Sequence, residues 1–354
     1  MSSVAIVTCE VGGLLRARLI EPRKVVVEEA SKPKAGPGEV VINVKYCGIC
    51  GSDIHAYHGV HPFISPPIVL GHEFSGVVEE VGSGVTGVEP GQRVVVEPLL
   101  TCGKCLNCRL GHYNRCVSMK VIGCQVDGAF AEYVLVPAHR VIPIPDEVSF
   151  KQGALVEPLA VAVHAVKRGG PLCGRSVVVL GAGPIGLLTA SVAKRWGAGE
   201  VMITDLSDRK LEVAKSLGVD HTVNARREDP IKVAREVFGE EGVDVIFECV
   251  GSNPVTIAQA IEMARRGATI VVVGVFSGDI PIKLGFVQDR ELELRGTAVY
   301  IFKDFLDAIQ LIRRGEVDVE KLVTKTFPLR EVPEAFRFIE ENRDEVIKVL
   351  IEVS

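Results

Sequence analysis

Residues 176–180, Ser-Val-Val-Val-Leu, form a short run of β-branched residues that is typical of a buried strand. The next six residues, Gly-Ala-Gly-Pro-Ile-Gly, allow a tight turn into the apolar helical pattern of residues 187–197. Alternating strand and helix patterns continue to residue 274, with a further strand pattern at 292–296. This alternation predicts a doubly wound parallel sheet that holds a cofactor at the carboxyl ends of its strands.

The glycine-rich turn predicts a dinucleotide site, because it stands between a strand and a helix, where backbone N–H groups can bind a pyrophosphate. Asp205 ends the next strand pattern, about 20 residues beyond the last glycine, where a carboxylate accepts hydrogen bonds from the adenosine ribose. This favours NAD, while Arg209 and Lys210 keep NADP open. The predicted phosphate-binding residues are Gly181, Ala182, Gly183, Pro184, Ile185 and Gly186.

The first part of the chain has a different pattern. Short alternating runs with Gly- and Pro-rich turns extend from residue 14 to about residue 155. Turns at such spacing predict a small antiparallel β-barrel or sandwich. A length of 354 residues suits roughly two domains.

A stretch at 47–73 gathers side chains that bind metals. A mixed thiol, imidazole and carboxylate set suits zinc, and it is more typical of a catalytic than of a structural ion. The alternative is a loop with a buried thiol and surface histidines. We expect these residues to lie on loops; they are Cys50, Ser52, Asp53, His55, His72 and Glu73.

Four cysteines at 102, 105, 108 and 116 close a short, polar segment with almost nothing apolar to pack. Four thiolates around a tetrahedral zinc can stabilise such a segment. An iron–sulfur cluster, two disulfides or free thiols are the alternatives. The predicted structural zinc ligands are Cys102, Cys105, Cys108 and Cys116.

Glu157 interrupts an apolar helical pattern at residues 154–166. A carboxylate in such surroundings is costly unless it is neutralised or bound, so Glu157 is a candidate ligand or catalytic group. His164, in the same pattern, is better explained as a core or helix-end histidine.

Composition excludes several classes of function. The net charge is −5 without a Lys/Arg block, which argues against nucleic acid or an anionic membrane as a partner. The first dozen residues lack the pattern of a secretory signal, so we expect a short extension and a cytoplasmic protein.

Together, the motif around Cys50, the Gly-His-Glu at 71–73, the four-cysteine segment and the glycine-rich turn resemble the zinc-dependent medium-chain alcohol dehydrogenases. The resemblance implies a GroES-like β-barrel catalytic domain (1–158 and 298–354) and a Rossmann NAD-binding domain (159–297). Glu157 stands where simple alcohol dehydrogenases have a cysteine, and this is similar to the polyol, sugar-acid and threonine dehydrogenase branch. A homotetramer is a family expectation.

The resemblance also implies roles for residues at matching positions. Cys50 and His72 would bind the catalytic zinc, Glu73 or Glu157 would ligate it directly or through water, and Asp53 would orient the ligand histidine. Ser52 and His55 would form a proton relay. The implied cofactor contacts besides the glycine-rich turn are Asp205, Lys210, Val273, Gly274, Val275, Ala298, Val299 and Tyr300.

Departures from the family limit the substrate prediction. Ala56 follows His55 where animal sorbitol dehydrogenases have tyrosine, and Val299 replaces their arginine. Residues 97–100 lack a histidine usual in threonine dehydrogenases. We therefore expect zinc-dependent, NAD-linked oxidation of a secondary alcohol in a small polyol or sugar acid. L-Threonine 3-dehydrogenase is the alternative, and a non-catalytic NAD- and zinc-binding protein is a more distant one.

Overall fold

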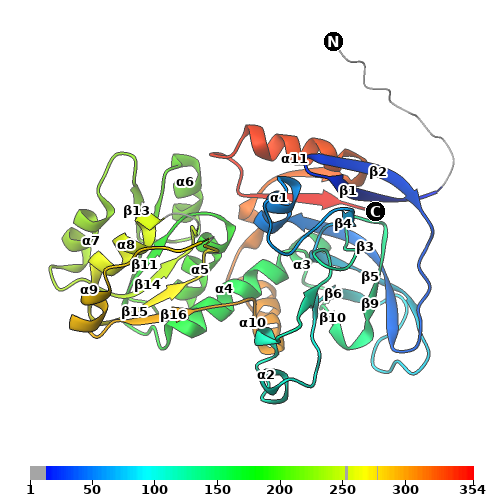
Figure 1. The fold of residues 1–354 in the computed structure, drawn as a ribbon, viewed down its shortest axis with the longest axis horizontal. Helices are drawn as coiled ribbons and strands as arrows, with labels where there is room; N and C mark the ends of the chain where they lie inside the picture. Colours follow the sequence, from blue (N-terminus) through cyan, green and yellow to red (C-terminus); the bar gives the residue numbers. More distant parts are fainter. Residues whose placement is uncertain (1–12, 252–253, 277) are drawn as a thin grey trace, which may run out of the picture.

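Six parallel strands form the sheet that the strand–helix alternation predicts (Figure 1, green to orange). The computed structural model describes residues 13–251, 254–276 and 278–354; the expected N-terminal extension lies outside them. In spatial order the strands are β13 (His221–Asn224), β12 (Glu200–Asp205), β11 (Ser176–Leu180), β14 (Val243–Glu248), β15 (Ala264–Val272) and β16 (Glu293–Gly296).

The strand order reverses at β11, because the chain runs from β11 to β12 and β13 on one side and returns through β14 to β16 on the other. The crevice beside such a reversal is where doubly wound sheets bind ligands. The helices of this region are α4 (Val156–Gly169), α5 (Pro184–Arg195), α6 (Asp208–Ser216), α7 (Pro230–Phe238), α8 (Pro254–Met263) and α9 (Leu284–Asp289).

The N-terminal half forms mainly antiparallel sheets, as its alternating pattern predicts (Figure 1, blue to cyan). A three-stranded sheet has the order β2 (Lys24–Ala30), β1 (Leu14–Glu21), β4 (Ile68–Val69). A larger sheet contains β10 (Val141–Pro143), β6 (Arg93–Val96), β5 (Glu73–Val81) and β3 (Glu39–Ile49), with β9 (Tyr133–Pro137) also paired to β3. The remaining elements here are β7 (Leu99–Leu100), β8 (Lys120–Val121), α1 (Gly51–Tyr57), α2 (Leu106–Arg109), α3 (Phe150–Gly153) and two 3-10 helices, η1 (Tyr113–Arg115) and η2 (Ala138–Arg140).

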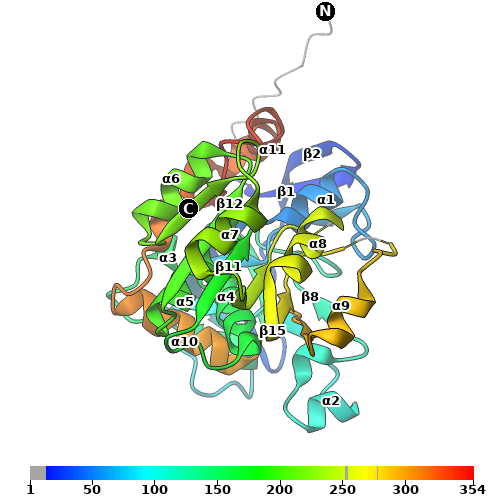
Figure 2. The same cartoon turned by 90° about the vertical axis from the view of Figure 1, so that its left-hand side faces the viewer.

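The end of the chain returns to the antiparallel sheet. After α10 (Phe302–Arg313), the strands β17 (Val323–Pro328) and β18 (Lys348–Glu352) flank α11 (Val332–Glu341), and β18 pairs antiparallel with β3. Figure 2 shows the same arrangement from the side of the parallel sheet, with α4 and α5 behind its strands and α11 beside β2. Because of this return, the last strand, β18, lies next to the predicted metal-binding residues that follow β3.

One expectation about the site is wrong. The residues predicted on loops include Ser52, Asp53 and His55, which instead lie on the short helix α1, and Glu73, which is the first residue of β5. Asp53 caps this helix, since its Oδ2 accepts a hydrogen bond from the Cys50 backbone N–H at 2.9 Å. A carboxylate in the first turn satisfies a backbone donor that would otherwise be unpaired. Among the described residues no helix is long and apolar enough to cross a bilayer.

Candidate active site

Three of the predicted catalytic zinc ligands meet at the ends of β3 and β5. Antiparallel pairing places Gly48 opposite Glu73, so that Cys50, just after β3, lies near His72 and Glu73. One ligand atom of each of Cys50, His72 and Glu73 lies within 4.8 Å of the other two. Gly48 leaves room for this carboxylate, because a Cβ at this position would stand 2.1 Å from Glu73 Oε2 and displace it. Thiolate, imidazole and carboxylate form a donor set that fits zinc.

Asp53 is fully buried behind His72. Its Oδ1 has no hydrogen-bond partner among the residues that the structure describes and lies 3.7 Å from the imidazole Nδ1. Burial raises the pKa of Asp53, while the nearby His72 lowers it. Burial lowers the pKa of His72, but Asp53 and Cys50 outweigh it and hold that pKa well above its ordinary value. An unpaired carboxylate oxygen beside a ring N–H fits the orientation of a metal-binding histidine.

Glu73 is held by a lysine that the sequence analysis did not identify. Lys348 Nζ lies 2.9 and 2.7 Å from the two carboxylate oxygens and also donates to the Ile49 carbonyl at 3.0 Å. Both side chains are buried. Burial lowers the pKa of Lys348, but Glu73 more than compensates. The only sequence signal for Lys348 is its place as a lone lysine within the apolar run 346–351, which indicates a buried charge in need of a partner but does not identify Glu73.

Glu157 lies in the first turn of α4 and outside the three-ligand group. Its Oε1 accepts a hydrogen bond from the Tyr300 hydroxyl at 2.7 Å, and both groups are buried. Burial raises the pKa of Glu157 to about 7, although His72 opposes the shift. The acid is therefore poised between its protonated and charged forms near neutral pH.

The remaining residues around this centre come from α1 and from the loop before β9. Ser52 and His55 lie three residues apart on α1, with Ser52 half-buried and His55 exposed. Residues at this spacing share a helix face. Cys124, another residue absent from our predictions, places its Sγ 4.0 Å from His72 Nδ1.

The four predicted structural ligands also come together. The sulfur atoms of the four cysteines all lie within 4.8 Å of one another. The Cys102 sulfur also accepts a hydrogen bond from the Cys105 backbone N–H at 3.3 Å. Backbone N–H groups of Lys104 and Cys105 lower the pKa of Cys102 to about 6, which favours a thiolate. The nine described cysteines assigned as free include all four, so two disulfides do not form here. The set fits a closed tetrahedral zinc site.

The predicted dinucleotide site surrounds the turn between β11 and α5. A Cβ at Gly186 would lie 1.8 Å from the Gly181 carbonyl, so this contact requires glycine. The Ala182 N–H donates to Asp205 Oδ2 at 2.7 Å, which draws the carboxylate at the end of β12 to the turn. Lys210 instead reaches the Arg343 carbonyl at 3.1 Å. This hydrogen bond holds the Asp205 carboxylate at the position predicted for the adenosine ribose.

The other predicted cofactor contacts follow β15 and β16. The N–H groups of Val273 and Gly274 both donate to the Glu248 carbonyl at 2.8 Å, and Val275 is exposed. Ala298 is exposed, Val299 half-buried and Tyr300 buried. These segments leave the sheet at the carboxyl ends of their strands, the edge where such folds bind nucleotides.

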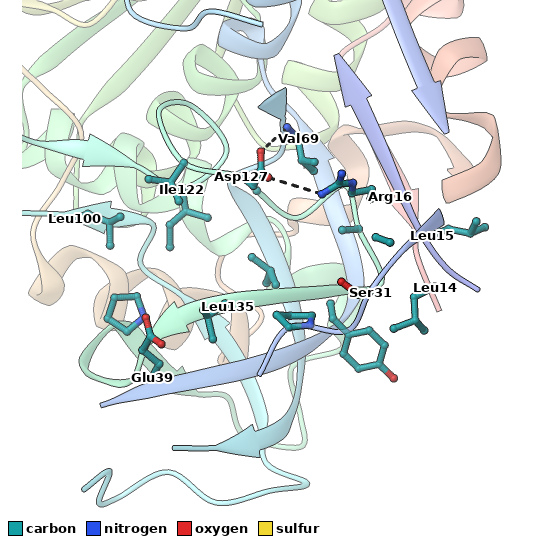
Figure 3. Close-up of a pocket in the computed structure, with 18 residues that line it drawn as sticks. Leu14, Leu15, Arg16, Ser31, Glu39, Val69, Leu100, Ile122, Asp127 and Leu135 are labelled. Carbon is teal, nitrogen blue, oxygen red and sulfur yellow. Dashed lines mark hydrogen bonds and ion pairs between the residues drawn. The ribbon is translucent and has the colours of Figure 1, made fainter. Parts of the chain in front are cut away.

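A separate hollow lies on the antiparallel half and contains none of the predicted site residues. It has a volume of about 330 Å³ and is lined mainly by apolar side chains of β1, β9 and neighbouring loops. Figure 3 shows Asp127 at its edge, which accepts from the Val69 N–H at 2.9 Å and lies 4.0 Å from Arg16. The described residues that line this hollow include no cysteine or histidine, so it does not offer the donor set of the metal-binding centre.

Two family descriptions match the chain. Residues 36–146 match the alcohol dehydrogenase GroES-like domain, and residues 184–314 match a zinc-binding dehydrogenase domain. The first covers Cys50, His72, Glu73 and the four-cysteine segment, and the second begins within the glycine-rich turn, while Glu157 lies between the two matches. Both agree with the division of the fold into an antiparallel half and a parallel sheet.

Similar proteins cover nearly the whole chain. A 2-dehydro-3-deoxy-L-galactonate 5-dehydrogenase from Pseudoalteromonas atlantica is 41% identical over 93% of this chain and 95% of its own. A sorbitol dehydrogenase from Bacillus subtilis is 35% identical, with 93% and 94% covered. A solved oxidoreductase of unknown specificity from Escherichia coli is 33% identical, with a TM-score of 0.92 and coverage of 97% and 100%. The chain therefore belongs to the zinc-dependent medium-chain alcohol dehydrogenases, in the polyol dehydrogenase branch, and is an oxidoreductase acting on CH–OH groups.

Proposed function

We propose that the protein oxidises a secondary alcohol of a small polyol or sugar acid to a ketone, reversibly, with NAD and a catalytic zinc. The observation that carries this proposal is the meeting of Cys50, His72 and Glu73 within 4.8 Å of one another, with the buried Glu157 near enough to feel the charges of His72 and Glu73. The two curated relatives support a polyhydroxylated substrate, since one is a sorbitol dehydrogenase and the other acts on a sugar acid.

The metal site would be formed by Cys50, His72 and an acid, Glu73 or Glu157. Bound zinc would supply a Lewis acid that lowers the pKa of an alcohol oxygen. Asp53 keeps the His72 ring oriented through the contact at Nδ1. Lys348 neutralises Glu73, which favours Glu157 as the acid that exchanges with substrate or water.

Proton transfer would use residues at the surface end of the centre. Ser52 and His55 share one face of α1, with His55 exposed to solvent, so they can pass a proton outward. Bound NAD would accept the hydride. The predicted contacts at Gly181–Gly186, Asp205, residues 273–275 and residues 298–300 would align its nicotinamide with the substrate carbon. Asp205 favours NAD over NADP, because it would repel a 2′-phosphate.

The four-cysteine segment would hold a second, structural zinc, so we expect two zinc ions per chain, one for each ligand group. We further propose the domain bounds 1–158 with 298–354 and 159–297, and a homotetramer. Light scattering of the purified protein measures its oligomeric state.

The test is a screen of NAD and NADP reduction over polyols, aldonates and threonine, combined with zinc analysis. We expect NADH formation with a polyol or aldonate and its loss in Cys50→Ala. Preference for threonine would replace this proposal by threonine dehydrogenation, and no reduction with any substrate would contradict it.

A further inference from the structure

The link between β16 and α10 contains a strained residue. Val299 has a backbone φ of +44°. A β-branched side chain rarely adopts this left-handed conformation, which is strained and persists only where the surroundings hold it. The link therefore needs anchors on both sides of Val299.

Both anchors come from the four-cysteine segment. Before Val299, the Asn114 side-chain amide donates to the Ala298 carbonyl at 3.1 Å. After Val299, the Tyr113 hydroxyl accepts from the Phe302 backbone N–H. Asn114 is buried, and its amide also lies 3.5 Å from the imidazole Nε2 of His164 on α4. Two neighbouring residues thus hold a link that lies nearly two hundred positions away in the sequence.

The Tyr113 side chain is itself held by two further residues, Glu97 and Arg140. Its hydroxyl donates to Glu97 Oε1 at 2.7 Å, so it is donor and acceptor at once. Arg140 pairs with Glu97 at 2.5 Å, and its guanidinium lies 5.1 Å from the centre of the Tyr113 ring. These contacts connect the Tyr113 hydroxyl to a buried ion pair, which limits the movement of the Tyr113 side chain.

The link presents one side chain to the candidate active site. Tyr300 lies between the two anchors, is fully buried and donates to Glu157 Oε1 at 2.7 Å. Its ring packs edge-on to Phe305 of α10, with centroids 5.2 Å apart. The position of the Glu157 carboxylate therefore depends on the backbone conformation at residues 298–302.

We propose that Tyr113 and Asn114 are positioning residues for catalysis: the four-cysteine segment clamps residues 298–302 in the strained conformation that aims Tyr300 at Glu157. This inference rests on the proposed function in taking Glu157 as part of the active site. It gives the structural metal segment a role in the geometry of the reaction centre in addition to stability.

The test compares Tyr113→Phe and Asn114→Ala with Asn107→Ala in the full-length, zinc-loaded protein. Asn107 is a matched control, because its side chain donates to the Arg115 carbonyl at 2.9 Å inside the same segment and does not touch the link. Tyr113→Phe keeps the ring and removes only the hydroxyl. Amide hydrogen exchange at residues 298–302 reports on the clamp without any substrate.

We expect exchange at residues 298–302 to become roughly tenfold faster in both test variants, with exchange in β12 unchanged. Per active site, counted by NADH binding, kcat should fall about 5- to 10-fold, the effect of one lost hydrogen bond. Asn107→Ala should alter neither quantity. Unchanged exchange at 298–302, or faster exchange with an unchanged kcat, would overturn the inference.

A second variant, at Val299, distinguishes the loss of the clamp on residues 298–302 from a general loss of structure. Glycine adopts a positive φ without a Cβ penalty, so Val299→Gly removes the strain that the clamp opposes. Measured in a Val299→Gly parent, Asn114→Ala should cost less than about twofold in kcat. The same loss in both backgrounds would contradict the clamp. If the unmodified protein reduced no NAD with any alcohol, the proposed function would fail, while the exchange measurement would still decide whether the clamp exists.

Discussion

Lys348, near the end of the chain, lies 2.7 Å from Glu73 Oε2, and both side chains are buried beside Cys50 and His72. The pairing of β18 with β3 brings them together. A buried charge is tolerated only with a partner, so this ion pair ties the C-terminal strand to the candidate metal centre.

Replacing Lys348 by Met should therefore destabilise the fold. The Glu73 carboxylate would remain buried without its partner, at a cost of about 3–5 kcal/mol in unfolding free energy. Denaturant unfolding measures this change. Lys24→Met is the control, because Lys24 pairs with Glu21 on the exposed surface and its loss should cost less than about 1 kcal/mol. The double variant Glu73→Gln/Lys348→Met should recover part of the loss; a double variant as unstable as Lys348→Met would argue against the pair.

His72→Ala should remove the catalytic zinc. We expect the zinc content to fall from two ions per chain to one and NADH formation to fall at least about a thousandfold, since metal activation of the alcohol is lost. Elemental analysis and a rate assay check both. Cys124→Ser is the matched control, because this thiol lies 4.0 Å from His72 but outside the ligand group. A His72→Ala protein with two zinc ions and a normal rate is the contrary result.

Cys105→Ser should remove the other zinc and lower the melting temperature. The segment from Cys102 to Cys116 contains only short helical turns, so its metal contributes folding free energy directly. A loss of about 3 kcal/mol corresponds to a few degrees in Tm for a chain of this size. Cys173→Ser, at an exposed lone cysteine, should leave both zinc content and Tm unchanged. Retention of both zinc ions in Cys105→Ser would exclude the four-thiolate site.

Asp205→Ser should weaken NAD more than NADP. The carboxylate is anchored by the Ala182 N–H at 2.7 Å, and charged hydrogen bonds to a ribose contribute about 1.5–3 kcal/mol. The ratio of kcat/KM for NAD over NADP should therefore fall roughly 10- to 100-fold. Initial rates with each cofactor give this ratio. Glu212→Gln, an exposed acid on α6, should leave it unchanged; a ratio unaltered in Asp205→Ser would show that another residue selects the cofactor.

Acid should destabilise the protein partly through Asp304. Burial raises the pKa of this acid, but hydrogen bonds from His164 and Lys167 outweigh burial and hold the pKa below its ordinary value. At acidic pH the unfolded chain therefore binds more protons than the folded protein. The stability that Asp304 contributes is fully present above the ordinary pKa of about 3.9, and it is lost as the pH falls through the lower pKa of the folded state. Unfolding between pH 2 and 6 measures this slope. Asp304→Asn should flatten it and exposed Asp146→Asn should not; equal slopes in all three proteins would contradict the assignment.

The sequence alone determined the features that are encoded by neighbouring residues. The glycine-rich turn between β11 and α5, the alternation of strands with helices, and the four cysteines each depend on residues close together in the chain. Hydrophobic periodicity and ligand spacing express these constraints directly, because the physical contacts are short-range in sequence. The alternation of strands and helices from residue 176 to residue 274 follows from them.

Only the tertiary structure decided the partners of the buried charges. Lys348 meets Glu73, and Tyr300 meets Glu157, across 275 and 143 positions of sequence. Asn114 reaches Ala298 in the same way. No local pattern encodes such pairs, since the strands and helices that carry them are brought together by the packing of their apolar faces. The sequence therefore identified side chains that can bind a metal or transfer a proton. The packing of the sheets decided which of them form ion pairs, hydrogen bonds or a metal site with one another.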